Sequence, residues 1–266
     1  MRVRTPVSQT GYSHPRCYRR HTKDCSPGIS GEHPISRNVL KELSTPTVLV
    51  DGVPWLAVGE RREMPITALE SNILCARHNA AFSDLDAEAG LFVKKIKEIR
   101  TTNGEFLSQK SSLTIFSGEA LEIWALKVAF GLFYAKYAAQ NRQHLLARHT
   151  IDHSLMDQAL RAEWQPHCGL YLFGAFGAEM VGGNSISVQP GMTNDNRFVA
   201  IQILVVGLHL MLIFDPHGVS DSNLLSRAGW FFRPTDLSFR IGEHQHWIVL
   251  TWPSGERFVA VEFTAV

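Results

Sequence analysis

The order of the hydrophobic patterns along the chain constrains its fold more than any other feature. Apolar residues recur at three- and four-residue spacings over much of Ile66–Trp164, whereas from Gly169 onward β-rich segments follow one another, separated by turns. Helices grouped ahead of strands, rather than alternating with them, predict an α+β fold and argue against a doubly wound α/β sheet. With 266 residues, 45% of them hydrophobic, the chain can bury enough core to be stable without disulfides.

The chain is predicted to divide into two domains, of which the first covers residues 1–100 and combines a loop-like start with short apolar pieces. A hairpin is expected over Thr47–Val58, because apolar runs flank the type I′ turn pair Asp51-Gly52. From Ile66 the spacing of apolar residues predicts helix, with a break near Ser83.

The second domain, residues 101–266, is predicted to be a helix pair packed on an antiparallel β-sheet. Its helices are expected over about 117–164: the first runs from Ser117, its cap, to His149 and is apolar nearly all round, and the second is amphipathic. Its strands are expected over about 169–263, with a hairpin turn at Pro253–Glu256.

Composition and the absence of a recognisable targeting signal bear on location. Only four cysteines are present, too few for a disulfide scaffold, which predicts reduced thiols in an intracellular protein. The Arg-rich, proline-interrupted N-terminus lacks the apolar stretch of a secretory signal. The most apolar segment, Ala120–Ala139, contains three ionisable residues, each of which is costly inside a bilayer. We therefore expect a cytoplasmic protein without a membrane partner.

The charge is distributed unevenly along the chain. Six basic residues and a single acid precede Cys25, although the net charge of the whole chain is only +1. A basic arm ahead of a mildly acidic body is typical of a chain end that meets a polyanion. The alternative is a solvated terminus that has no partner.

Three of the four cysteines lie in the first third of the chain, together with a histidine at metal-ligand spacing. Cys75 and His78 form a C-x2-H pair, which allows two ligands to reach one ion from a helix start. Cys17 and Cys25 would complete a tetrahedral Cys3His site for a structural Zn²⁺, which would close a segment whose own core is small. His21 is an alternative to either of these two cysteines, and ordinary buried thiols are the alternative to a metal site.

His33 stands in the stretch SGEHPIS, where the adjacent proline prevents a regular helix or an inner strand from continuing, and the two halves of the predicted zinc site flank it. This arrangement, and the segments ISGEHPIS and LCARHNAAFSDLD in particular, resembles the HNH endonuclease family (His-Me finger or ββα-metal nucleases), including bacterial HNH-type proteins, over roughly residues 15–90. The resemblance implies that residues 1–100 form a zinc-stabilised ββα-metal module. In such a module a hairpin presents a histidine and the following helix presents a histidine or asparagine.

The chemistry that the resemblance implies is metal-dependent hydrolysis of phosphodiester bonds in nucleic acid, with DNA favoured. His33, neutral at pH 7, would be the general base that takes a proton from water. Glu32 and Asn79 would bind one catalytic Mg²⁺ or Mn²⁺. The basic residues expected to hold the nucleic-acid backbone are Arg16, Arg19, Arg20 and Lys23.

Two positions depart from the family pattern. Ser36 stands where the pattern has a proline, and Glu70 stands where its middle asparagine is usual, so Asn72 and Asn38 are alternatives for that role. The nearby acids that are interpreted as helix-start caps, with no metal role, are Asp84 and Asp86.

Two other interpretations of the chain stay open. One is a non-catalytic zinc-stabilised module that binds nucleic acid or protein and retains only the scaffold. The other is a structural or regulatory subunit whose residues 101–266 carry the function. Those residues contain no phosphate loop and no G-x-S-x-G or H-E-x-x-H motif, and a homodimer contact or a protein partner would suit them.

Overall fold

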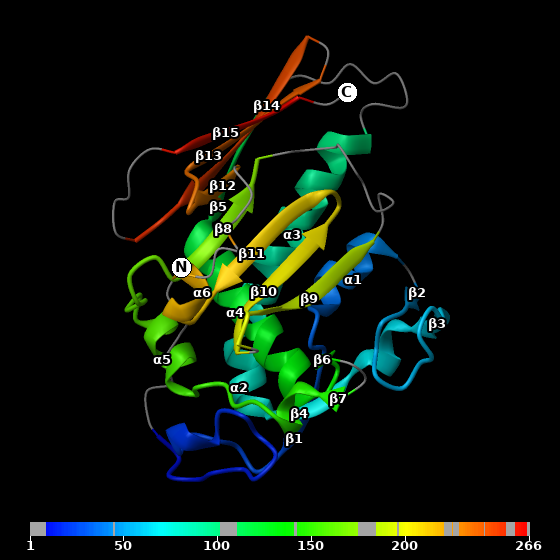
Figure 1. The fold of residues 1–266 in the computed structure, drawn as a ribbon, viewed down its shortest axis with the longest axis vertical. Helices are drawn as coiled ribbons and strands as arrows, with labels where there is room; N and C mark the ends of the chain where they lie inside the picture. Colours follow the sequence, from blue (N-terminus) through cyan, green and yellow to red (C-terminus); the bar gives the residue numbers. More distant parts are fainter. Residues whose placement is uncertain are drawn as a thin grey trace.

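The fold is mixed α+β, as predicted, with 32% helix and 33% strand arranged in several sheets. The N-terminal loops and short strands lie at one end of the molecule, a four-stranded sheet lies at the other, and helix α4 (Gly118–Tyr134) lies at the centre (Figure 1). The start of the basic arm and residues 254–256 of the predicted turn lie outside the described residues. This computed structural model describes residues 9–44, 46–101, 111–140, 143–174, 185–195, 197–220, 225, 229–241, 243–253 and 259–264.

An antiparallel strand pair and a short helix form the N-terminal end. Strand β1 (Ile29–Glu32) pairs with β4 (Ser71–Cys75), and α2 (Ala76–Ala81) starts directly after β4. Two strands and a helix therefore lie together, although a long excursion of the chain separates the strands in sequence. The excursion contains α1 (Arg37–Leu43), β2 (Thr47–Val50), β3 (Arg62–Pro65) and the 3-10 turn η2 (Ile66–Leu69).

The helix predicted from Ile66 is wrong in its first part, because η2 and β4 precede α2. Pairing with β1 satisfies the backbone groups of β4 and outweighs the helical spacing of its apolar residues. The predicted break is confirmed, since α2 ends at Ala81 and α3 (Ser83–Thr101) begins at Ser83.

The hairpin predicted over Thr47–Val58 is wrong in its second strand. Strand β2 pairs with β3, and residues 53–60 form turns between them. Gly52 has a φ of 67°, a conformation that glycine adopts without strain, so the chain does bend there. The apolar run that suggested a strand instead supplies Leu56, whose side chain is buried from within a turn.

Helices α3 and α4 pack against each other at the centre of the molecule. Ser117 caps α4 as predicted, accepting a hydrogen bond of 3.1 Å from the N–H of Ala120. In the described part of the chain, no helix combines the length and the apolar character that crossing a bilayer requires. The buried residues of α3 recur at helical spacing: Leu85, Ala89, Phe92, Val93, Ile96 and Ile99.

Helix α4 was predicted to run to His149 but ends at Tyr134. The chain turns back there, with Lys136 at a φ of 62° and the N–H groups of Tyr137 and Ala138 both donating to the carbonyl of Leu132. The second predicted helix is also shorter than its pattern, because Ala162 adopts a φ of 57°. The elements that follow α4 are β6 (Ala139–Gln140), β7 (Gln143–His144), the 3-10 turn η3 (Leu145–Ala147) and α5 (Ser154–Leu160).

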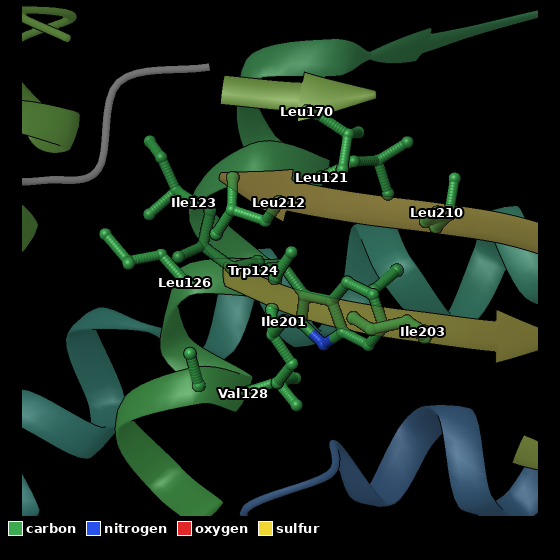
Figure 2. Close-up of a cluster of buried hydrophobic side chains, with 14 of the residues drawn as sticks. Leu121, Ile123, Trp124, Leu126, Val128, Leu170, Ile201, Ile203, Leu210 and Leu212 are labelled. Atoms are coloured by element: carbon green, nitrogen blue, oxygen red, sulfur yellow. The ribbon is translucent and has the colours of Figure 1, made fainter. Parts of the chain in front are cut away.

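A five-stranded antiparallel sheet covers one side of α4, which confirms a helix packed on an antiparallel sheet. Figure 2 shows Trp124 of α4 among side chains from the strands, including Ile201, Ile203 and Leu212. Burying this apolar surface is the main stabilising interaction between helix and sheet. The strand order is β12 (Trp230–Phe232), β8 (Gly169–Phe173), β11 (Leu208–Ile213), β10 (Phe198–Val205) and β9 (Ile186–Met192), and α6 (Pro216–Ser220) follows β11 in sequence.

The remaining long strands form a separate mixed sheet, so the prediction of one antiparallel sheet is incomplete. Only β13 and β14 pair antiparallel; β15 pairs parallel with β13, and β5 pairs parallel with β14. Strand β5 precedes α4 and reaches β14 through a long crossover, which is how parallel strands are joined. The order is β15 (Ala260–Thr264), β13 (Asp236–Ile241), β14 (His244–Thr251) and β5 (Ser112–Ser117).

The main hydrophobic core does not stop at the predicted boundary near residue 100. A single cluster of buried side chains extends from Cys17 through α3 and α4 to Phe263. The N-terminal end and the sheets are therefore packed on the same pair of helices.

Candidate metal centre

Local structure brings the four predicted metal ligands together. Cys75 is the last residue of β4 and the N-cap of α2, and its sulfur accepts a hydrogen bond from the N–H of His78 one turn later. Cys17 and Cys25 flank the 3-10 turn η1 (Arg20–Thr22), after which Lys23 reverses the chain at a φ of 54°. All four ligand side chains are buried.

The distances within this Cys3His group suit a tetrahedral ion. The sulfurs of Cys17, Cys25 and Cys75 lie 3.5, 3.7 and 3.2 Å from Nδ1 of His78, and the four ligand atoms all lie within 4.8 Å of one another. Ordinary zinc–sulfur and zinc–nitrogen bond lengths at a tetrahedral angle place such atoms about 3.6 Å apart. The group could therefore hold a structural Zn²⁺, and no other group of three or more His, Cys, Asp or Glu ligands occurs among the described residues.

The hydrogen bonds around His78 leave the nitrogen that faces the sulfurs free to bind an ion. The hydroxyl of Thr22 donates its one hydrogen to the carbonyl of Arg19, at 2.9 Å. Its oxygen must therefore accept from Nε2–H of His78, at 3.2 Å. The lone pair of the neutral ring then lies on Nδ1. A partner on the far nitrogen that fixes the tautomer is typical of histidine metal ligands.

The protonation states of the cluster also bear on metal binding. Burial raises the pKa of Cys17 to about 12 and lowers the pKa of His78 to about 4. Burial alone would raise the pKa of Cys75 as well, but backbone hydrogen bonds from His78 and Ser26 hold it below its ordinary value. The histidine is neutral at pH 7, and a bound cation would displace the thiol protons.

His21, the alternative ligand, is engaged elsewhere. Its Nε2 lies 2.9 Å from Oδ2 of Asp157 on α5. The choice between His21 and the two cysteines is therefore resolved in favour of Cys17 and Cys25.

His33 follows the last residue of β1 and packs into the interior. Its side chain is only 7% exposed, and its Nε2–H donates to the carbonyl of Ile66 at 3.1 Å. Burial lowers the pKa of His33, so the ring is neutral at pH 7 and its lone pair lies on Nδ1, which no other described residue hydrogen-bonds. The loop packs directly on α4, where a Cβ at Gly131 would lie 2.9 Å from Cα of Pro34.

Glu70, which occupies the position of the family's middle asparagine, lies against His33. Its Oε1 is 3.7 Å from Nε2 of His33. The neighbouring Gly31 leaves room for this carboxylate, since a Cβ there would lie 2.6 Å from Oε2 of Glu70. Glu70 stands five residues before Cys75, where it departs from the family pattern, and the sequence assigned it no role at the site. Both alternatives, Asn38 and Asn72, are exposed.

Glu32 is paired with a buried lysine of α4. Its carboxylate contacts Nζ of Lys127, which also lies 2.8 Å from both carboxylate oxygens of Asp86 on α3. Burial raises the pKa of Glu32 to about 7, although the charge of Lys127 opposes the shift. Sequence reasoning missed Lys127 and interpreted Asp86 only as a cap. The available signal was the one lysine of a helix that is mostly apolar.

The raised pKa of Glu32 predicts a pH-dependent stability. The unfolded carboxyl releases its proton near pH 4.5, whereas the folded one retains it up to about pH 7, so stability falls as the pH rises through that range. Relative to Glu32→Gln, the wild type should lose on the order of 3 kcal/mol of unfolding free energy between about pH 4.5 and 7. Urea unfolding of both proteins across this range measures the difference. Parallel pH profiles would contradict the assignment.

Glu32 and Asn79 do not present an open pair of oxygens to a divalent ion. Glu32 is held by Lys127, and the amide of Asn79 donates to the hydroxyl of Ser30 at 2.8 Å. The two predicted ligands lie on the same strand–helix unit, but none of the described contacts joins them. The catalytic ion stays a prediction that this arrangement does not favour.

The predicted nucleic-acid contacts separate into two groups. Arg16, Arg20 and Lys23 are exposed around η1. Arg19 is buried, with Nη2 lying 2.8 Å from Oδ1 of Asp157 and its guanidinium over the ring of Phe82. Arg19 therefore joins η1 to α5 and is not available to a phosphate.

An apolar cavity of about 900 Å³ lies beside the His33 loop, between α1, α4, β2 and β9. Its only charged lining residues, Asp51 and Arg61, pair with each other at 3.3 Å. The cavity therefore offers no unpaired charge to a phosphate.

No family model, curated protein or solved structure matches this chain.

Proposed function

We propose that the chain is an HNH-type endonuclease, a phosphodiester hydrolase that acts on nucleic acid, with DNA favoured. In this proposal His33 is the general base and the Cys3His group holds a structural Zn²⁺. The observation that carries the proposal is the hydrogen bond from Nε2–H of His33 to the carbonyl of Ile66. That bond fixes the ring and leaves the Nδ1 lone pair as the base.

The surrounding scaffold supports the same function. Strands β1 and β4 and helix α2 give the two strands and the helix of a ββα unit, and the Cys3His group ties its helix start to the preceding loop. His33 follows β1, where the family has its catalytic histidine. The exposed Arg16, Arg20 and Lys23 provide positive charge for a nucleic-acid backbone.

As a general base, His33 needs only the correct position and a neutral ring. Neutral at pH 7, the imidazole accepts a proton from a water molecule as that water attacks phosphorus. The bond from phosphorus to the leaving oxygen breaks, and solvent protonates the leaving group. Ile66 and Glu70 orient the ring from its far nitrogen.

The non-catalytic module is a second candidate, and two specific observations favour it. The side chain of His33 is 7% exposed, and Glu32 is neutralised by Lys127. A scaffold that binds nucleic acid or protein without cleaving it would have both features.

Plasmid nicking by zinc-loaded protein with Mg²⁺ or Mn²⁺ distinguishes the two candidates. We expect the wild type to relax supercoiled DNA, and His33→Ala to lose at least about 100-fold in rate, because a positioned general base contributes about that much or more. The zinc content of His33→Ala should be unchanged.

His217→Ala is the matched control, since this histidine is exposed on α6 and pairs with Asp215. Its nicking rate should equal that of the wild type. Full activity in His33→Ala would remove His33 from the mechanism. A zinc-loaded wild type that leaves the plasmid intact would favour the non-catalytic module.

A further inference from the structure

Lys127 places a buried positive charge between two carboxylates. Its Nζ lies 2.8 Å from Oδ1 and 2.8 Å from Oδ2 of Asp86, and it contacts Oε1 of Glu32. The side chains of Lys127 and Glu32 are 3% and 5% exposed. Three elements meet at this ammonium: the end of β1, the first turn of α3 and the middle of α4.

The position of this ammonium matters because Glu32 directly precedes His33. Glu32 is also the residue that the HNH resemblance assigns to a divalent ion. Mg²⁺ would need the carboxylate oxygens at about 2.0–2.1 Å, together with several waters in an octahedron. The ammonium already lies within hydrogen-bond distance of oxygens on both carboxylates, so ion and lysine cannot occupy the position together.

The ammonium of Lys127 has no nearby opening through which it could reach solvent. It lies at the centre of α4, and a lysine needs a nearby opening to water if its charge is to leave the interior. The residues one turn before and after it on the helix are themselves buried: Ile123, Trp124, Phe130 and Gly131.

We propose that Lys127 is the resident cation of this site, occupying the position that a divalent ion would take beside Glu32, so that the intact chain binds no divalent ion there. The inference rests on the proposed function only in the choice of Glu32 as the expected ligand. The lysine, and not an ion acquired from solution, then holds Glu32 and Asp86 together.

The direct test is Mn²⁺ binding to zinc-loaded protein, measured by the loss of the free-ion signal in electron paramagnetic resonance. Wild type and Glu32→Gln should leave the same amount of Mn²⁺ free. A Mn²⁺ ion that binds the wild type and is lost in Glu32→Gln would overturn the proposal, whatever any other variant does.

Lys127→Met provides the complementary test, since it empties the position and leaves two carboxylates to attract an ion. Millimolar Mn²⁺ should raise the thermal midpoint of Lys127→Met by about 5 °C or more and leave that of the wild type unchanged. The triple variant Lys127→Met, Glu32→Gln, Asp86→Asn should fold and show no response. A Lys127→Met protein that Mn²⁺ does not stabilise, beside a folded triple variant, would contradict the proposal.

Neither readout uses DNA, so the inference and the proposed function can fail separately. An inactive protein in the nicking assay leaves the Mn²⁺ result unchanged. If the wild type binds Mn²⁺ through Glu32, the inference about Lys127 is wrong, but the proposal that His33 is the general base is unaffected.

Discussion

Replacing Cys75 with alanine is expected to abolish zinc binding by the Cys3His group and to lower the thermal midpoint of the zinc-loaded protein by roughly 10 °C or more. Cys75 ends β4, caps α2 and supplies the sulfur closest to Nδ1 of His78, at 3.2 Å. Without it, three ligands remain, and three buried groups lose the ion that would satisfy them. Zinc content measured by mass spectrometry should fall from about one ion per chain to a small fraction.

Cys168 provides the matched control for this experiment. It is the fourth cysteine, it is buried, and it lies outside the Cys3His group in a separate cluster of apolar side chains. Cys168→Ala should retain its zinc and lose little stability, since it removes only a small buried atom. Zinc retained by Cys75→Ala at the level of Cys168→Ala would contradict zinc binding by the Cys3His group.

Half of the candidate metal centre was predictable from sequence because it is local. Cys75 and His78 are one helical turn apart, and a spacing of three is enough to specify two ligands of one ion. For Cys17 and Cys25 the sequence offered His21 as an alternative. The structure resolves that choice through Asp157, which lies 136 residues from His21 in sequence and has no local signal.

Two of the errors in the predicted fold have a common physical origin. The apolar spacing of β4 predicts helix because its strand partner β1 lies far away in sequence, and local spacing does not report that pairing. The mixed sheet was missed for the same reason. Its strands β5 and β14 are neighbours in space, but in sequence α4 and all the strands of the antiparallel sheet lie between them. The type of element was predicted correctly where one face of the element is buried and the other is exposed, as in α3.

Around His33, too, local properties could be predicted from the sequence, whereas contacts between distant segments could not. Its protonation state followed from the ordinary properties of imidazole, whereas Glu70 was noted only as a departure from the family pattern. The contacts of Lys127 were not predicted, because its two partners come from β1 and from α3, the latter 41 residues away. A lone lysine in a buried helix signals that partners exist, but the identity of those partners depends on the fold.

Replacing Arg233 with methionine is expected to destabilise the protein by about 3–5 kcal/mol. Arg233 donates from Nε and Nη2 to the two carboxylate oxygens of Glu122, both at 2.9 Å, and Glu122 also accepts from the N–H of Leu170 at 2.7 Å. Glu122 lies on α4 with its side chain 1% exposed, so the variant would leave an uncompensated buried charge. Urea unfolding at neutral pH measures the loss.

The double variant Glu122→Gln, Arg233→Met separates charge from packing. Glutamine retains an oxygen for the N–H of Leu170 but carries no charge, so the double variant should recover at least half of the stability lost in Arg233→Met. Arg233 also lies over the rings of Phe232 and Trp252, at 5.1 and 5.5 Å from their centroids, and this packing is lost in both variants. If the single and double variants are equally unstable, the stacked rings account for the effect of Arg233. Recovery in the double variant would instead show that the uncompensated charge of Glu122 accounts for most of the loss in Arg233→Met.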